Sequence, residues 1–310
     1  MVEPDADVRR NRELKMKVFV TGASGWIGSA LVPELLENGH QVLGLARSDH
    51  SAADITAAGA EAYRGSLDEP AGLRDAVERC DGVVHLAYNH DFSHMDDAAR
   101  TDRAVIEAIG SVLKGTERPF VVAGGVLGLA PGRVATENDV PDANLHPRIA
   151  NLQWTLSLAD QGVRPACVRF APTVHGDGDH GFIATLVAIA RAKGASGYVG
   201  DGNRWSAVHR FDAARLVRLA LERAPAGSSV HAVAEEAVTT KSIAEAIGAG
   251  LGLPVISVPS DEASEHFGWM ARFFGTDASA SNAITREMLG WDPTHEGLLR
   301  DLGEDHYFRV

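Results

Sequence analysis

The sequence has few cysteines, no long apolar run and no excess of positive charge. Its two cysteines, Cys80 and Cys167, each lie inside an apolar stretch, which is typical of buried thiols rather than of a disulfide framework. No apolar run approaches the roughly 18 residues of a membrane span. The formal net charge of -13 disfavours nucleic acid or an anionic membrane surface as a partner. We therefore expect a globular, cytoplasmic protein.

The first residues also lack the hydrophobic segment of a secretory signal. Residues 1–15 are charged, and Met16 immediately precedes the first apolar run. A signal peptide needs a continuous apolar stretch of its own. We expect residues 1–15 to form a flexible extension.

The segment from Lys17 to Gly28 reads KVFVTGASGWIG. A short apolar run ends at Gly22, two more glycines follow at Gly25 and Gly28, and a helical pattern begins there. In this context the glycines permit a tight turn, a close approach of a pyrophosphate and close packing of the helix on the strand. The helix N-terminus adds unpaired N–H groups and a positive dipole. The sequence thus predicts a dinucleotide site.

Strand patterns and helical patterns then alternate as far as residue 176. This alternation is typical of right-handed crossovers and of a parallel sheet covered on both faces. We therefore predict an α/β fold with a doubly wound parallel sheet over residues 16–176. The alternation stops after residue 176, and residues 177–310 are expected to form mainly a smaller substrate-binding cap, with some segments returning to the sheet.

The end of the second expected strand bears on the choice between the two nicotinamide dinucleotides. An acidic residue there would accept from the ribose 2′-hydroxyl and repel a 2′-phosphate. This chain has Arg47 and Ser48 instead, and a guanidinium matches a phosphate with two hydrogen bonds. We expect NADP(H) in preference to NAD(H), although Asp49 keeps NAD(H) open.

The glycine turn and the expected strand ends supply the candidate ligand-binding residues. The cofactor candidates are Gly22, Ser24, Gly25, Trp26, Ile27, Gly28, Arg47, Ser48, Ser66, Leu67, Leu86, Ala87, Ala123, Pro172 and Val174. The substrate candidates are His90, Gly124, Gly125, His180, Phe182 and Trp205. The paired glycines at 124 and 125 leave room for a bulky substrate.

The glycine-rich stretch from His175 to Gly181 contains residue types that bind metals. Its ligand spacing does not match an EF-hand. We expect no metal there, and interpret the stretch as a loop that closes over the substrate.

Together these segments resemble the extended branch of the short-chain dehydrogenase/reductase superfamily, the epimerase/dehydratase-like group. The segments that carry the resemblance are Thr21–Gly28, His85–Ala87, Arg169–Gly176, Trp205–His209 with Asp212–Ala214, and Leu289–Trp291. The resemblance implies a nicotinamide cofactor at the glycine turn and a substrate between two lobes. It also implies a homodimer through the helices expected over 97–113 and 144–161.

The sequence departs from the family at the catalytic pair. Family members usually carry Tyr-x-x-x-Lys before the sixth strand, but none of the four tyrosines here has a lysine four places on. The candidates for catalysis are therefore His175, Tyr88 and Arg148. Three functions stay open: an atypical NADP(H)-dependent oxidoreductase acting on a carbonyl or imine-like group, a redox-neutral isomerase, lyase or cyclase that retains the cofactor, and a dinucleotide-binding protein without catalysis.

Overall fold

A computed structural model describes residues 15–89, 95–200 and 203–309. The expected extension, apart from Lys15, and the candidate His90 lie outside the described residues. The chain divides into two compact units that are interleaved along the sequence. The first unit comprises the described part of Met1–Ala123 with Asp142–Cys167 and Val217–Ser228. The second comprises Gly124–Pro141, Val168–Leu216 and Ser229–Val310.

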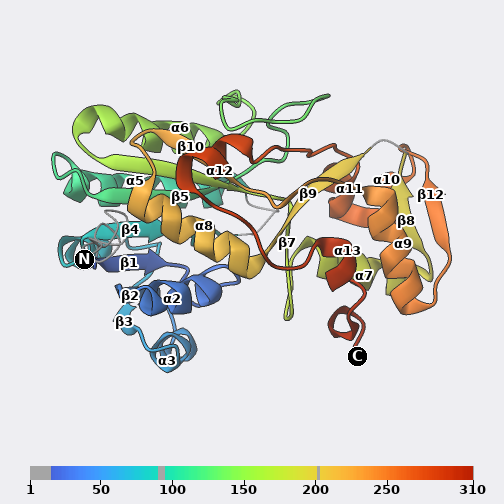
Figure 1. The fold of residues 1–310 in the computed structure, drawn as a ribbon, viewed down its shortest axis with the longest axis horizontal. Helices are drawn as coiled ribbons and strands as arrows, with labels where there is room; N and C mark the ends of the chain where they lie inside the picture. Colours follow the sequence, from blue (N-terminus) through green and yellow to red (C-terminus); the bar gives the residue numbers. More distant parts are fainter. Residues whose placement is uncertain (1–14, 90–94, 201–202, 310) are drawn as a thin grey trace, which may run out of the picture. The chain divides into compact units, whose positions relative to one another are not determined.

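The main sheet has seven strands in the order β10-β6-β5-β4-β1-β2-β3 (Figure 1). The strands are β1 Lys17–Thr21, β2 Gln41–Ala46, β3 Glu61–Arg64, β4 Gly82–His85, β5 Pro119–Gly125, β6 Arg164–Phe170 and β10 Ser228–Ala232. The pairs from β3 to β5 are parallel. The doubly wound parallel sheet is confirmed. Its strand order reverses between β1 and β4, where such sheets bind their ligands.

Helices cover the sheet of the first unit. They are α2 Gly28–Glu37, α3 Asp49–Ala57, α4 Arg74–Glu78, α5 Met95–Leu113 and α6 Pro147–Ser157. The long helices α5 and α6 pack side by side (Figure 1). The core beneath them is aliphatic and aromatic, with Phe19, Leu43 and Phe120 fully buried. Because β1 and β4 are buried in this core, their carboxyl ends are fixed relative to each other.

The second unit contains two small sheets, with strand orders β11-β9-β7 and β12-β8. Their strands are β7 Thr173–His175, β8 Ser196–Val199, β9 Arg204–His209, β11 Glu235–Thr239 and β12 Val255–Val258. The helices are α7 Phe182–Lys193, α8 Arg210–Arg223, which crosses the boundary of the units, α9 Thr240–Leu251, α10 Ala263–Phe267, α11 Ala271–Phe274, α12 Ala283–Leu289 and α13 Leu298–Asp301. Short 3-10 helices occupy Pro70–Leu73, Leu158–Gln161, Gly268–Met270 and Asp305–Tyr307.

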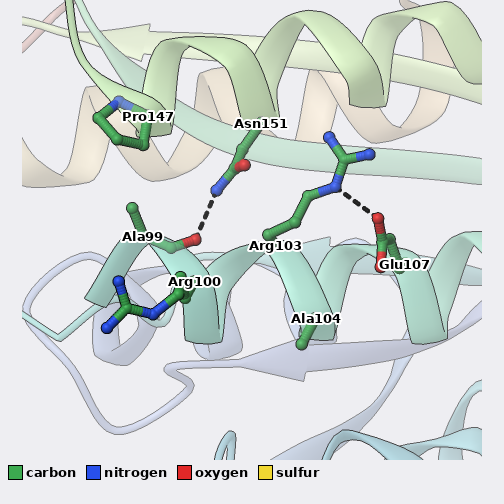
Figure 2. Close-up of a pocket in the computed structure, with 7 residues that line it drawn as sticks. All are labelled: Ala99, Arg100, Arg103, Ala104, Glu107, Pro147 and Asn151. Atoms are coloured by element: carbon green, nitrogen blue, oxygen red, sulfur yellow. Dashed lines mark hydrogen bonds and ion pairs between the residues drawn. The ribbon is translucent and has the colours of Figure 1, made fainter. Parts of the chain in front are cut away.

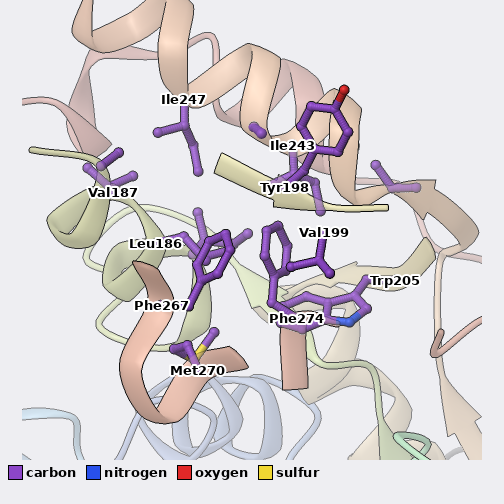
Figure 3. Packing of buried hydrophobic residues seen from close by; sticks show 14 of the residues in the cluster. Leu186, Val187, Tyr198, Val199, Trp205, Ile243, Ile247, Phe267, Met270 and Phe274 are labelled. Atoms are coloured by element: carbon purple, nitrogen blue, oxygen red, sulfur yellow. The ribbon is translucent and has the colours of Figure 1, made fainter. Parts of the chain in front are cut away.

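A separate hydrophobic core holds the second unit together. Figure 3 shows Trp205 and Phe274 packed beneath Val199, with Phe267 beside Leu186 and Met270 below Phe267. Burial of such side chains contributes about 1.5–3 kcal/mol each. The second unit therefore has a core of its own, independent of the large sheet.

Candidate active site

The glycine turn between β1 and α2 has the geometry of a dinucleotide cradle. Gly22 has φ +71°, a left-handed conformation, and a Cβ built there would lie 2.8 Å from the Ala87 backbone nitrogen. A Cβ at Gly28 would lie 1.9 Å from the Gly22 carbonyl oxygen. No side-chain cap closes the N-terminus of α2. The turn is thus too tight for side chains and leaves the helix N-terminus for an anion such as a pyrophosphate.

The remaining residues of the turn and of the neighbouring strand ends are open to a ligand. Ser24 and Gly25 are exposed, while Trp26 and Ile27 are partly buried. Partly buried residues also follow β3 and β4, and these are Ser66, Leu67, Leu86 and Ala87. The hydroxyl of Ser66 donates to Asp68, 3.1 Å away. The first unit therefore holds the predicted cofactor residues up to Ala123.

At the end of β2, Arg47 and Ser48 are exposed. The Ser48 hydroxyl caps α3 by accepting the Ser51 N–H at 3.1 Å. Arg64, at the end of the neighbouring strand β3, lies 3.3 Å from the Asp49 carboxylate. Within the described ranges Arg47 makes no salt bridge, so its guanidinium is available to an anion. Arg64 was missed by the sequence reasoning, although its position at a strand end beside β2 was a usable signal.

Tyr88 and Arg148 come together in the first unit. Tyr88 follows β4, and Arg148 lies in the first turn of α6, which Pro147 begins. The guanidinium carbon of Arg148 lies 3.8 Å from the centroid of the Tyr88 ring, a cation–π contact. The Arg148 Nη2 donates to the Ala123 carbonyl oxygen at 3.2 Å, and this carbonyl lies near the end of β5. The two candidates thus form one group at the carboxyl ends of β4 and β5.

The electrostatics of this pair favour a protonated phenol. Burial raises the pKa of Tyr88 above its usual value, and the positive charge of Arg148 opposes that rise. The Nε of Arg148 is buried and has no hydrogen-bond partner among the described residues. An unpaired buried donor costs free energy unless a ligand accepts from it. The pair therefore places a phenol and a permanent positive charge together at the ends of β4 and β5.

His175 lies in the second unit and is buried, with 1% of its surface exposed. Its Nδ1 lies 2.8 Å from an oxygen of the buried Asp301, and its ring meets His209 edge-on at 5.4 Å between centroids. His175 is therefore enclosed by protein groups and is not placed to touch a substrate directly. The sequence reasoning missed Asp301, which is 126 positions away and carries no local signal.

The other candidates of the second unit differ in exposure. His180 is exposed, and Pro172 and Val174 are partly buried. Gly125 is exposed, and a Cβ built on it would meet only the Phe170 carbonyl oxygen at 3.9 Å. Gly124, its neighbour in β5, is buried.

Two aromatic substrate candidates occupy different depths of the second unit. Phe182 is partly buried, with its ring centroid 5.6 Å from that of Trp205. Trp205 itself has no exposed surface, and its indole N–H donates to the Thr276 carbonyl oxygen at 3.2 Å. Its predicted contact with substrate does not fit this position, because a residue of the core cannot reach a ligand directly; Trp205 instead packs against the Phe182 ring.

A groove lies between α5 and α6. Its volume is about 360 Å³, and its lining residues are Ala99, Arg100, Arg103, Ala104, Glu107, Pro147 and Asn151 (Figure 2).

Among the described residues, no group of three or more His, Cys, Asp or Glu side chains could hold a metal ion. None of the described helices is long and apolar enough to cross a membrane.

The comparisons with known proteins agree with this geometry. The model of the NAD dependent epimerase/dehydratase family matches residues 18–233. A Schizosaccharomyces pombe protein described only as uncharacterized is 49% identical over 296 residues, covering 94% of this chain and 100% of that protein. The 2-alkyl-3-oxoalkanoate reductase of Stenotrophomonas maltophilia is 28% identical over 228 residues, covering 69% of this chain and 68% of the reductase.

A solved structure has the same fold. The UDP-glucose 4-epimerase of Thermotoga maritima, determined with UDP-glucose, aligns with a TM-score of 0.73 and 19% identity, covering 94% of this chain and 98% of the epimerase. The sheet and the glycine turn define an extended short-chain dehydrogenase/reductase. More specifically, the chain belongs to the NAD dependent epimerase/dehydratase family. A family of this kind binds a nicotinamide dinucleotide, and the cradle of Gly22 and Gly28 fits one.

Proposed function

We propose that the protein is an atypical NADP(H)-dependent oxidoreductase that acts on a carbonyl or imine-like group of a bulky small molecule. The observation that carries the proposal is the stacking of Arg148 on Tyr88, 3.8 Å from guanidinium carbon to ring centroid. This pair brings a phenol and a permanent positive charge together without the Tyr-x-x-x-Lys motif. Tyr88 and Arg148, rather than the enclosed His175, are assigned the catalysis.

In this proposal Tyr88 gives its proton to the oxygen or nitrogen of the reacting group. The nicotinamide, when bound, supplies the hydride in this direction; in the reverse direction it accepts the hydride and the Tyr88 phenolate takes the proton. Burial keeps the Tyr88 phenol protonated before the reaction, because it raises the pKa. The Arg148 charge over the ring stabilises the phenolate that remains afterwards, as the lysine of the usual pair does. General acid catalysis of this kind contributes about 10²–10⁴ in rate.

The space at the end of β5 supports a bulky substrate. Gly125 is exposed, and a Cβ there would have no neighbour closer than 3.9 Å. The relative from Stenotrophomonas maltophilia carries the name of an oxoalkanoate reductase, which supports a carbonyl as the reacting group. We keep Phe182, His180 and Gly124 as substrate candidates, and residue 176 as the limit between cofactor-binding and mainly substrate-binding sequence.

The preference for NADP(H) is proposed from the exposed end of β2. Arg47 is exposed and makes no salt bridge within the described part of the chain, whereas the nearby Asp49 carboxylate is paired with Arg64. A 2′-phosphate would thus meet two guanidinium groups and a neutralised carboxylate.

Two further properties belong to this proposal. A homodimer through α5 and α6 is supported by the family resemblance and by the side-by-side packing of these long helices. A cytoplasmic location is supported by the two cysteines, which are buried free thiols.

A thermal-shift titration of the purified protein with NADPH, NADP⁺, NADH and NAD⁺ tests the cofactor part. A ligand at a hundredfold excess over its Kd stabilises by about 2.7 kcal/mol, so binding is easily resolved. We expect larger shifts with the phosphorylated pair. Stabilisation by none of the four would overturn the proposed function, and equal shifts with all four would overturn the preference. Product formation without net change of bound cofactor would identify the redox-neutral alternative.

A further inference from the structure

A chain of four buried polar side chains crosses the first unit. The Thr21 hydroxyl lies 2.7 Å from His85 Nδ1, and His85 Nε2 lies 3.2 Å from one oxygen of Asp102. The other oxygen of Asp102 accepts from the Asn151 side-chain amide at 2.8 Å. Exposed fractions are 0% for Thr21, 3% for His85, 6% for Asp102 and 5% for Asn151. None of these residues is needed by the proton transfer proposed above.

The hydrogen bonds of these four side chains converge on Asp102. The Asp102 carboxylate can only accept, so His85 donates from Nε2 and, when neutral, accepts at Nδ1. The Thr21 hydroxyl then donates to Nδ1, and its oxygen accepts the Ala87 N–H at 3.2 Å. Burial raises the pKa of Asp102, but the hydrogen bonds from His85 and Asn151 outweigh it and leave the pKa below its usual value. The carboxylate therefore keeps its charge, and both His85 and Asn151 donate to it.

One end of the chain lies at the cofactor turn. Thr21 is the last residue of β1 and precedes Gly22, where a Cβ would come within 2.8 Å of the Ala87 nitrogen. By accepting the Ala87 N–H, the Thr21 hydroxyl ties the segment after β4 to the end of β1. The position of the glycine turn therefore depends on the orientation of this hydroxyl.

The other end lies on the helix of the proposed catalytic arginine. Asn151 is three residues after Arg148 in α6, and residues three apart lie on the same side of a helix. The Asn151 amide also donates to the Ala99 carbonyl oxygen of α5 at 2.8 Å (Figure 2). The charge of Arg148 contributes to the lowered pKa of Asp102. Asp102 is thus connected both to the turn and to α6.

We propose that Asp102 is a positioning residue for the cofactor site: through His85 and Thr21 it sets the glycine turn, and through Asn151 it ties that turn to α6. The inference rests on the proposed function, because it requires a nicotinamide dinucleotide at the turn. A buried ionised group is no more stabilising than a well-packed apolar one. The hydrogen bonds of Asp102 connect β1, β4, α5 and α6. A role in positioning these elements therefore explains the buried carboxylate better than a contribution to stability does.

The test is the Kd of NADPH and of NADH, measured by calorimetry. Asp102→Asn keeps the shape but lets the new amide donate to His85, which reverses the chain and redirects the Thr21 proton. Thr21→Val removes the hydroxyl at similar volume, and Thr21→Ser retains it. We expect about tenfold weaker binding of both dinucleotides in Asp102→Asn and in Thr21→Val, consistent with one lost hydrogen bond. Thr21→Ser and the exposed control Asp75→Asn should bind as the wild type does.

The double variant Asp102→Asn/Thr21→Val distinguishes positioning from two separate defects. Both changes act through the same hydroxyl. The Kd of each dinucleotide in the double variant should therefore be no higher than the Kd in whichever single variant binds it more weakly. Wild-type affinity in Asp102→Asn, or losses that multiply in the double variant, would overturn the inference. If Asp102→Asn does not fold, Asn151→Ser, which removes the amide donor to Asp102 and with it the tie to α6, takes its place; weaker binding of both dinucleotides is expected, and wild-type affinity would overturn the inference. A wild-type protein that binds neither dinucleotide would instead overturn the proposed function.

Discussion

The guanidinium of Arg148 stacks on the ring of Tyr88, with 3.8 Å between its carbon and the ring centroid. Tyr88 follows β4 and Arg148 lies in the first turn of α6, so the two side chains come from segments 60 positions apart in the sequence. Arg148 is anchored on the Ala123 carbonyl oxygen, which fixes the charge above the ring. This protein therefore has a positive charge beside a tyrosine, as in the Tyr-x-x-x-Lys motif. Here the charge comes from an arginine on a different segment of the sequence and not from a lysine four residues after the tyrosine.

Removing either member of the pair should lower turnover and leave cofactor binding intact. We expect Tyr88→Phe to lose about 10²–10⁴ in kcat, the range of general acid catalysis. Arg148→Met should lose a similar amount, and Arg148→Lys less, because it keeps the charge but not the planar stack. Steady-state kinetics and the Kd of NADPH are the measurements. Tyr198→Phe, in the second unit, is the matched control; equal losses in Tyr198→Phe and Tyr88→Phe would contradict the assignment.

Arg47 should determine the preference for the phosphorylated dinucleotide. Arg47→Ala is expected to raise the Kd of NADPH about ten- to a hundredfold, since a hydrogen bond to a charged group contributes about 1.5–3 kcal/mol. The Kd of NADH should not change, which makes NADH the internal control. Arg64→Ala should have a smaller effect in the same direction. Parallel changes for both dinucleotides would show that Arg47 does not read the phosphate.

A side chain at residue 125 should restrict the size of the substrate. Gly125 has no left-handed φ and its Cβ would have no neighbour closer than 3.9 Å, so Gly125→Val should fold normally. We expect it to lower kcat/KM for large ketones about tenfold or more and to spare small ones, because the new side chain occupies room beside the end of β5. The measurement compares two ketones of different bulk. Equal loss for both would mean that residue 125 does not line the substrate site.

The histidine cluster of the second unit should make stability depend on pH. Burial, together with the positive charges of His175 and His295, lowers the pKa of His209 to about 4. An unfolded histidine titrates near 6.5, so the unfolded state binds more protons between these values. The contribution of the neutral His209 ring to the free energy of unfolding is fully present above about pH 6.5 and is lost as the pH falls towards 4. The loss amounts to at most about 3 kcal/mol. Urea unfolding at several pH values measures it.

The variant His209→Gln isolates this contribution. The ring of His209 stacks on His295 with 4.6 Å between centroids, so both protonation and removal of the ring affect the same contact. The pH dependence between 6.5 and 4 should become shallower in His209→Gln. The exposed His50→Gln, whose side chain is 89% exposed, should keep the wild-type profile. An unaltered profile in His209→Gln would assign the dependence to other groups.

The centre of the large sheet could be predicted because its strands β1 and β4 lie in continuous apolar runs. The run before Gly22 and the stretch Asp81–Ala87 each contain one of the buried strands, β1 and β4. The small strands of the second unit were harder to predict. β7 has three residues and β11 begins with two glutamates, so neither gives a periodicity that can be distinguished from a loop.

The residues of the candidate site could be predicted from the sequence, but the contacts between them could not. Tyr88 and Arg148 were identified separately from their positions after a strand and at a helix start. Their stacking depends on where α6 lies relative to the segment after β4, which no local pattern encodes. The hydrogen bonds that connect Thr21 to Asn151 could not be predicted for the same reason, since Thr21 and His85 are 64 positions apart.

The most direct test of the central claim follows NADPH oxidation and alcohol formation together, with a panel of 3-oxoalkanoates and aryl ketones. The proposed function predicts that the wild type forms one alcohol for each NADPH oxidised. It also predicts that Tyr88→Phe binds NADPH normally but reduces the same ketone at least about a hundredfold more slowly. A Tyr88→Phe variant that reduces the ketone at the wild-type rate would contradict the account.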